Sequence, residues 1–364
     1  MSLLEHLRLI PDPRKDLNKQ HELMDVIFLA FSAVLSGATG WKSMEQFGEE
    51  QLDWLQSHGA FKNGLTPRRH CIAYIIKVLN TESLVNALCA WVNERREQSG
   101  KALIALDGKT LRGTGNSIEN ALHLVSAYDV SNGISLYQKS AATKGHEGEV
   151  ARDIIELLAL EGRIITMDAL HCQVNTLDKI VKGKGDFVIQ LKANQKTLYE
   201  QVRMAFSETY GSEQLVEYTE HSKGHGREEH RTVMQLTVNL PLALQTRWPH
   251  IRSIIEVSSE RTCHGKTSCD SRWYVSSLSI DAVAAAQAVR RHWEIENNLH
   301  WVLDVVFRED EMTISAQNGA AHVALFNRVA LGIIKQHTGK KDSMVAKRRG
   351  AAWNPAFRSE LIFG

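Results

Sequence analysis

The sequence predicts a mixed α/β protein, with parallel and antiparallel strands in one sheet, and three observations lead to this fold class. Residues 1–98 show helical periodicity without a strand pattern. From about residue 101, short apolar strands alternate with amphipathic helices, which is typical of a sheet with crossover helices. Further strand patterns crowd together between residues 205 and 280. We therefore expect a central mixed sheet, an N-terminal helical domain and a β-rich insertion.

Length, charge and cysteine content narrow the class of protein. A chain of 364 residues favours two or three domains. A net charge of +1 indicates no global basic field, although a local basic groove is enough to bind nucleic acid. Five cysteines form no paired framework, and the charged N-terminus lacks a signal-peptide pattern. The most apolar run contains Asp25 and is shorter than the roughly 20 residues that a bilayer requires. We expect a cytoplasmic protein without membrane contact.

The first 98 residues are predicted to form helices. A helix-turn-helix that binds DNA and a plain helical support domain both fit this region, because TPRRHCIAYIIKVLN carries two arginines near a helix start. The expected helices are His21–Leu35, Ser43–Ser57, Arg69–Leu79 and Glu82–Arg96.

The next hundred residues predict the order β-β-β-α-β-α-β, which matches that of ribonuclease-H-like proteins. KALIALD reads as a strand that ends in Asp107, and the following two strands flank Asn132-Gly133, a strong hairpin signal. A helix over EGEVARDIIELLALEG leads to the strand RIITMD, which ends in Asp168. A helix at Val174–Val181 and the strand DFVIQL complete the order.

The remaining chain predicts an insertion, a return to helix and a basic end. MQLTVNL, IRSIIEVSSE and RWYVSSLS read as strands with no helix pattern between them, whereas AAHVALFNRVALGIIKQH reads as a helix. The end of the chain fits a phosphate-binding tail or a merely solubilising one. The predicted domains are residues 1–98 (helical), 99–204 with 281–340 (catalytic core), 205–280 (insertion) and 341–364 (basic tail).

Three acidic residues are candidates for chemistry. Asp107 and Asp168 each end a buried strand, where open α/β sheets place their sites. Glu296 falls beside Leu299 and Leu303 on the apolar face of a helix predicted from Arg291 to Phe307. A buried, unpaired carboxylate is costly, so a metal or a neighbouring arginine should compensate it. Clustered oxygen ligands suit Mg²⁺, with Mn²⁺ as a substitute, and two such ions can activate a nucleophile on a phosphodiester. Caps or simple ion pairs remain alternatives for each acid.

At these residues the sequence resembles the DDE transposases of bacterial insertion sequences, in the branch that includes H-repeat proteins linked to Rhs elements. The resemblance covers nearly the whole chain. It implies a ribonuclease-H-like core with a β insertion, and Asp107, Asp168 and Glu296 as catalytic metal ligands. It also implies double-stranded DNA as substrate, a homodimer on DNA and a nucleoid-associated location. The motifs that carry it are PDPR, LDGKTLRG (106–113), TMDALHCQ (166–173), DFVIQLKANQ (186–195), GHGREEHR (224–231) and HWEIENNLHWVLDVVFRED (292–310).

Several polar residues near these acids are expected to contact DNA. Related enzymes carry Tyr-x2-Arg-x3-Glu-x6-Lys around the glutamate, and this chain lacks the first, second and last of those residues, so Arg290, Arg291 and His300 are the nearest substitutes. Asp304 lies two turns beyond Glu296 and is expected to support it. His171-Cys172 is expected to pack rather than react. The other predicted DNA contacts are Lys109, Arg112, Lys192, Asn194 and Gln195.

The sequence therefore predicts a DNA transposase that cuts element ends and joins the released 3′-hydroxyls to target DNA. Two alternatives stay open. One is a metal-dependent nuclease that does not join strands, and the other is a DNA-binding or regulatory protein whose catalysis has lapsed.

Overall fold

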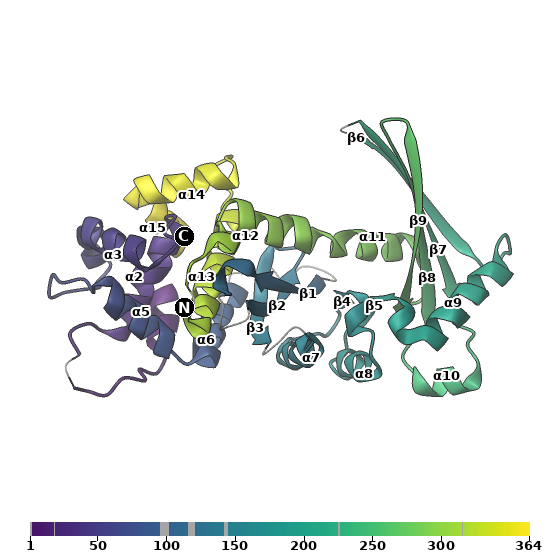
Figure 1. The fold of residues 1–364 in the computed structure, drawn as a ribbon, viewed down its shortest axis with the longest axis horizontal. Helices are drawn as coiled ribbons and strands as arrows, with labels where there is room; N and C mark the ends of the chain where they lie inside the picture. The colour runs from purple at the N-terminus through teal and green to yellow at the C-terminus, as the bar shows by residue number, and fades with distance from the viewer. Residues whose placement is uncertain are drawn as a thin grey trace. The chain divides into compact units, whose positions relative to one another are not determined.

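The structure is a computed structural model, and it describes residues 2–17, 19–94, 102–115, 121–141, 145–224, 226–314 and 316–364. The chain divides into two compact units, each built from separate segments (Figure 1). The first unit holds Met1–Gln98, Gly108–Glu147 and Glu296–Gly364, and the second holds Ser99–Asp107 and Gly148–Ile295. The predicted domain boundary between residues 98 and 99 lies outside the described residues.

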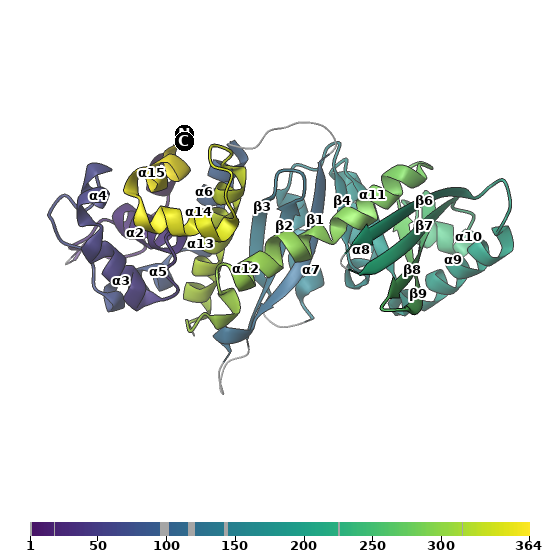
Figure 2. The same ribbon diagram turned by 90° about the horizontal axis from the view of Figure 1, so that it is seen from above.

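The first unit is built around one long buried helix, α13 (Gln317–Gln336). Residues 319–334 of this helix are all buried. The helix contacts α2, α5, α6 and strand β3, so it is covered on nearly all sides (Figure 2). The predicted N-terminal helices are present, although the second is broken into two. The helices are α1 (Leu3–Arg8), α2 (Leu23–Leu35), α3 (Trp41–Glu50), α4 (Leu52–Ser57), α5 (Arg69–Val78) and α6 (Thr81–Glu94).

The predicted hairpin belongs to the same unit. Strands β2 (Leu122–Asp129) and β3 (Ile134–Ala141) pair antiparallel. Asp129 accepts hydrogen bonds from the amides of Ser131 and Asn132, and Gly133 adopts a φ of 69°, so the turn residues fix the hairpin.

The second unit carries the parallel strands. Strand β1 (Leu103–Leu111) begins here and continues into the first unit after Asp107. The predicted strand end at Asp107 was therefore wrong, because Asp107 lies inside β1. It pairs in parallel with β4 (Ile164–Met167), which pairs in parallel with β5 (Asp186–Leu191). Helices α8 (Val174–Lys182) and α11 (Ala282–His292) lie on opposite sides of β4 and β5 (Figure 1). Helix α7 (Glu147–Leu157) precedes β4.

The insertion is a long antiparallel sheet that extends from β5. Together the nine strands follow the order β3-β2-β1-β4-β5-β9-β8-β7-β6, so the sheet is mixed, as predicted. Only Trp273–Ser276 of β9 pair with β5, so the rest of β9 and its neighbours continue beyond that strand. The four strands are β6 (Val216–Gly224), β7 (Arg227–Thr237), β8 (Ser253–Cys263) and β9 (Lys266–Ser276).

Two helices, one inside the insertion and one at its start, were not predicted. Helix α10 (Leu242–Arg247) lies between β7 and β8, where no helix was expected, because Pro241 starts a turn that was too short to show a period. HSKGHGREEH lies in the β6–β7 hairpin, and His225 at its centre lies outside the described residues. Helix α9 (Lys196–Thr209), after β5, was also not foreseen.

The end of the chain forms two helices instead of a tail. Helices α14 (Met344–Trp353) and α15 (Pro355–Phe363) follow α13 in the first unit. Arg348 is buried, donates hydrogen bonds to the carbonyls of Val34 and Val306, and lies 4.2 Å from the Phe307 ring centroid. Arg358 lies over the Trp54 ring at 4.0 Å. These arginines stabilise packing, so they are not available to bind phosphate.

Among the described residues, no single helix is long and apolar enough to cross a membrane. Only the bent pair Arg69–Val78 and Thr81–Val92, which turns by 90°, passes that test of length and composition.

Candidate active site

The two candidate aspartates occupy matching positions on neighbouring parallel strands. In the second unit, Leu103 of β1 pairs with Ile164 of β4 and Ala105 pairs with Thr166, an offset of 61 residues. Asp107 and Asp168 have the same offset, so continuing the register by two residues brings them side by side. Adjacent strands are about 4.8 Å apart, and equivalent residues point to the same face of the sheet. This register puts both aspartates near the C-terminal end of β4.

The loop that carries Asp168 is fixed by a short helix and by two amide side chains. Asp168 caps η2 (Ala169–His171), where its Oδ1 accepts a hydrogen bond from the Leu170 amide at 3.1 Å. Asn194 donates to the Ala169 carbonyl at 2.7 Å, and Gln195 donates to the Cys172 carbonyl at 2.9 Å. Asn194 and Gln195 were expected to contact DNA, but their amide donors bind the backbone on both sides of η2. They hold the Asp168 loop.

A half-buried histidine lies near Thr166 and Asp168 in the same unit. His292 Nδ1 lies 3.0 Å from Thr166 Oγ1, and burial lowers the pKa of His292 to about 4, despite the charge of Asp168. The imidazole is therefore neutral at pH 7. Burial also raises the pKa of the Cys172 thiol to about 12, so this cysteine is not a nucleophile, as the sequence suggested.

The helix around Glu296 differs from the predicted one. The chain does not continue as one α-helix from Arg291 to Phe307, because Glu296–His300 form a π-helix (η4) before α12 (Trp301–Val305). A π turn contains one residue more than an α-helical turn, so side chains before it point in different directions from those that a regular α-helix would give. Leu299 and Leu303 stay buried as expected, but the Glu296 side chain is 59% exposed. The predicted burial of Glu296 was wrong.

Glu296 has a close partner within its own helix. His300 Nδ1 lies 3.0 Å from Glu296 Oε2, and the His300 side chain is buried. This hydrogen bond, together with the positive charge of Lys109, holds the pKa of Glu296 below its ordinary value. Glu296 is therefore ionised at neutral pH and points an anionic oxygen toward solvent. His300 was expected to contact DNA, but its burial leaves it as a partner of Glu296.

Lys109 belongs to a buried network of charges in the first unit. Its Nζ forms an ion pair with Asp304 and lies 3.3 Å from Glu309 Oε2. Glu309 in turn lies 2.7 Å from Arg328 Nη1, and both of these side chains are 0% exposed. Lys109 was expected to contact DNA, but it is buried and held by two carboxylates. Asp304 supports β1 through Lys109 instead of supporting Glu296 directly.

The last glycine of the LDGKTLRG motif, Gly113, lies where a side chain would not fit. A Cβ at this position would lie 2.5 Å from the Asp310 carbonyl oxygen and 2.6 Å from the Met312 carbonyl oxygen. The short 3-10 helix η1 (Arg112–Thr114), which follows β1, can thus pack against η5 (Glu309–Glu311) only because Gly113 has no side chain.

The remaining predicted DNA contacts are cations of varied exposure. The Arg112 side chain is 84% exposed, and its Nε lies 3.9 Å from Asp310. Lys192 is exposed and lines an open cavity with Arg272 and Trp293. Arg290 lies 2.7 Å from Glu220, and Arg291 lies 3.7 Å from Glu294. Arg112 and Lys192 are the better-exposed cations of this set.

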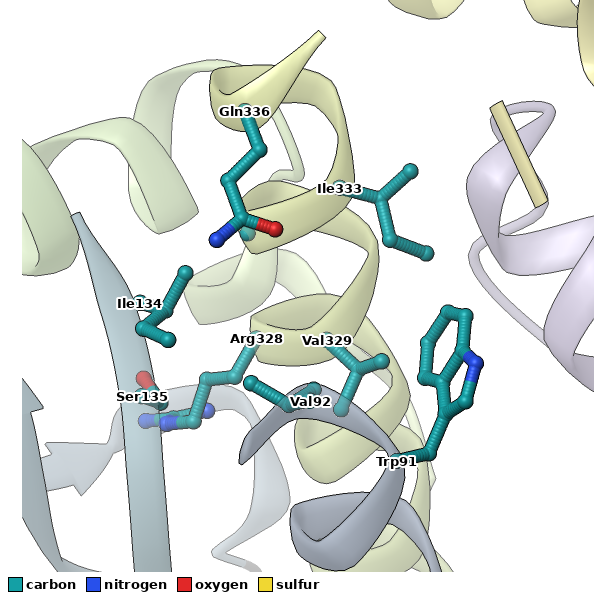
Figure 3. Close-up of a pocket in the computed structure, with 9 residues that line it drawn as sticks. Trp91, Val92, Ile134, Ser135, Arg328, Val329, Ile333 and Gln336 are labelled. Carbon is teal, nitrogen blue, oxygen red and sulfur yellow. The ribbon is translucent and has the colours of Figure 1, made fainter. Parts of the chain in front are cut away.

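Sequence patterns did not identify Glu309, Arg328 or His292 as part of this arrangement. Arg328 extends from α13 toward Ser135 of β3 and lines a cavity of about 10 Å³ (Figure 3). This is below the roughly 300–1,000 Å³ of typical ligand sites, so the cavity is a packing feature. An arginine within the apolar α13 sequence was the signal for a buried ion pair.

The candidate ligands in each unit are of the kind that a hard divalent cation prefers. The second unit offers the carboxylates of Asp107 and Asp168, and the first offers the carboxylate of Glu296 beside one imidazole. Such oxygen-rich sets suit Mg²⁺ and Mn²⁺ and do not resemble the thiolate-rich sites of structural zinc.

The chain was compared with protein families, with curated proteins and with solved structures. The protein named "Putative transposase YncI" from Escherichia coli O157:H7 is 31% identical over 99% of this chain and 94% of its own length. "H repeat-associated putative transposase YhhI" from Escherichia coli K12 is 30% identical over 100% of this chain and 98% of its own length. A cryo-EM structure of a piggyBac transposase synaptic complex with hairpin DNA aligns with 99% of this chain and 76% of its own, at 11% identity and a TM-score of 0.45, which is too low to support an argument.

Two family models match the chain. Residues 4–92 match the DDE_Tnp_1-associated family, and residues 98–331 match the family described as "Transposase DDE domain". The second match includes Asp107, Asp168 and Glu296. The chain belongs to the DDE transposase family, as its motifs indicated.

Proposed function

We propose that this protein is a DNA transposase whose active site is formed by Asp107, Asp168 and Glu296. Membership of the DDE transposase family supports a DNA strand-cleaving and strand-joining activity. The observation that supports the site best is the register of β1 and β4, in which Asp107 and Asp168 have the same 61-residue offset as the paired residues. The exposed, ionised carboxylate of Glu296 is available as a third ligand.

The proposed fold of the catalytic part is a ribonuclease-H-like core. The observed element order β1, β2, β3, α7, β4, α8, β5 supports this, and α11 with the following segments adds the C-terminal helices. In this proposal residues 99–204 and 281–340 form the core, residues 205–280 the insertion and residues 1–98 a helical domain that serves DNA binding.

The three carboxylates would hold two Mg²⁺ ions, with Mn²⁺ as a substitute. Bound ions of this kind polarise the scissile phosphate and ease deprotonation of the attacking water or 3′-hydroxyl. The protein's own residues fix the ligands. Asn194 and Gln195 hold the Asp168 loop, and neutral His292 stays bound near Thr166 without repelling a cation. Lys109 is neutralised by Asp304 and Glu309, so it adds little repulsion.

The same site would serve both reactions, because cleavage and strand joining are each a displacement at a phosphodiester. In the first, water attacks and a 3′-hydroxyl leaves. In the second, that 3′-hydroxyl attacks target DNA, and a target 3′-oxygen leaves. Exposed Arg112 and Lys192 are proposed to contact DNA phosphates, with Arg290 and Arg291 as further candidates. The substrate is double-stranded DNA, and the active form is a homodimer that pairs two element ends.

A strand-joining assay tests this function. A labelled DNA fragment with a 3′-hydroxyl at one inverted-repeat end is incubated with the full-length protein, Mg²⁺ or Mn²⁺, and a supercoiled plasmid. The proposal expects the label to become covalently joined to the plasmid, and Asp107→Asn to abolish the joining. Nicked plasmid without joined label would identify a nuclease. DNA binding without any cleavage would identify a regulatory protein and contradict the proposal.

A further inference from the structure

The pairing of Glu296 with His300 is a feature that the carboxylate triad does not explain. Both residues lie on the π-helix η4, four positions apart. The imidazole is buried, whereas the carboxylate is exposed. A buried imidazole has few rotamers available, so the nitrogen that faces Glu296 is fixed by packing and not by solvent-exposed contacts.

The separation of the two ligand atoms fits a shared cation. Glu296 Oε2 and His300 Nδ1 lie 3.0 Å apart. Two ligands that bind one octahedral ion at about 2.1 Å, at right angles to each other, are also about 3.0 Å apart. A cation could therefore replace the hydrogen bond without a change in the separation of these two atoms. The π turn supports this arrangement, because single π turns inside helices occur frequently at functional sites.

We propose that His300 is a nitrogen ligand of the cation that Glu296 binds, so that the site contains imidazole as well as carboxylates. This inference rests on the proposed function, since it concerns the same cation. Imidazole binds first-row transition metals better than it binds Mg²⁺, which prefers oxygen. The site should therefore bind Mn²⁺ more tightly than a purely carboxylate site would, and His300 should account for much of that preference.

The alternative role for His300 is to orient Glu296 by a hydrogen bond. Histidine–carboxylate pairs that act in this way are common around metal sites. The two roles differ in one observable: a ligand places nitrogen directly on the metal, whereas an orienting residue leaves only oxygen ligands there.

Pulsed EPR of Mn²⁺ bound to the full-length protein separates the two roles. The probe is Mn²⁺ alone, without DNA, and the signal is the modulation from directly bound ¹⁴N. The wild type is expected to show this coupling, and His300→Gln is expected to lose it. Protein labelled with ¹⁵N-histidine should show the ¹⁵N pattern instead, which tests the assignment to a histidine even if His300→Gln folds poorly.

A matched control is available in the same unit. His337 Nε2 lies 2.8 Å from Glu360 Oε1, so this pair has similar chemistry outside the site. His337→Gln should retain the nitrogen coupling. Titration should show a Kd for Mn²⁺ that rises about 10-fold or more in His300→Gln, while competition shows a smaller change in the Kd for Mg²⁺.

The outcomes distinguish this inference from the proposed function. Mn²⁺ that binds in dependence on Asp107 and Glu296, but without nitrogen coupling in the wild type, overturns the inference and leaves the proposed function intact. Coupling that persists in His300→Gln also overturns it. Mn²⁺ binding that is unaffected by Asp107→Asn and Glu296→Gln contradicts the proposed site itself.

Discussion

Glu309 compensates buried positive charge beside β1, and replacing it with glutamine is a strong test of this network. Its carboxylate lies 2.7 Å from Arg328 Nη1 and 3.3 Å from Lys109 Nζ. Arg328 and Lys109 hold the pKa of Glu309 below its ordinary value, although burial alone would raise it. Glutamine keeps the shape but removes the charge. Because loss of one partner from a buried ion pair costs about 3–5 kcal/mol, we expect Glu309→Gln to lower the free energy of unfolding by that amount.

A matched control lies two residues away. Glu311 is in the same short helix and pairs with Arg308, but the two side chains are 61% and 62% exposed. Exposed pairs contribute about 0–1 kcal/mol, so Glu311→Gln should have little effect. Urea unfolding, followed by circular dichroism and tryptophan fluorescence, measures both variants. The double variant Glu309→Leu/Arg328→Met should recover part of the loss, because it removes both charges. A Glu309→Gln effect within 1 kcal/mol of the Glu311→Gln effect refutes the buried network.

Three further predictions concern other parts of the site. Asn194→Ala should lower the free energy of unfolding by about 1 kcal/mol, because the Asp168 loop loses a hydrogen bond. The variant should also cleave DNA more slowly than the wild type while it binds DNA equally well. Slower cleavage together with a raised Kd for DNA would contradict this. In the folded protein the pKa of His292 is about 4, below its ordinary value of 6.5, so the unfolded state takes up the proton first as the pH falls. The free energy of unfolding should therefore fall by about 3 kcal/mol between pH 6.5 and 4. The pH dependence of urea unfolding should flatten in His292→Gln, and an unchanged slope would be the contrary result. Gly113→Ala should destabilise the protein by about 1–3 kcal/mol, because the added Cβ would meet two backbone carbonyl oxygens. If the variant unfolds at the same temperature as the wild type, the packing around Gly113 is not tight.

The strands around the two aspartates could be predicted from sequence because their signals are local. The runs ending in Asp107 and Asp168 are apolar and short, and Asn132-Gly133 specifies a hairpin turn. An equal offset between two parallel strands is also visible once their pairing is assumed. The same reasoning placed α13 correctly, because its apolar pattern is long.

The surroundings of Glu296 could not be predicted in the same way. A regular period of 3.6 residues placed Glu296 on the buried face, and nothing in the residue types indicates the extra residue of a π turn. Lys109 and Arg348 were read as solvent-exposed cations, because burial of a charge depends on partners far away in the chain. Short helices such as α10 span too few residues to show a period.

The central claim is that Asp107, Asp168 and Glu296 act together in one metal-dependent site. The most direct test measures single-strand cleavage of DNA that carries the inverted repeats flanking the coding region, in Mn²⁺, by the wild type and by Asp107→Asn, Asp168→Asn and Glu296→Gln. The account predicts that each of the three variants loses at least about 100-fold in rate, or about 2.7 kcal/mol of transition-state stabilisation, while Glu311→Gln cleaves as the wild type does. Cleavage at the wild-type rate by any one of the three variants would contradict it.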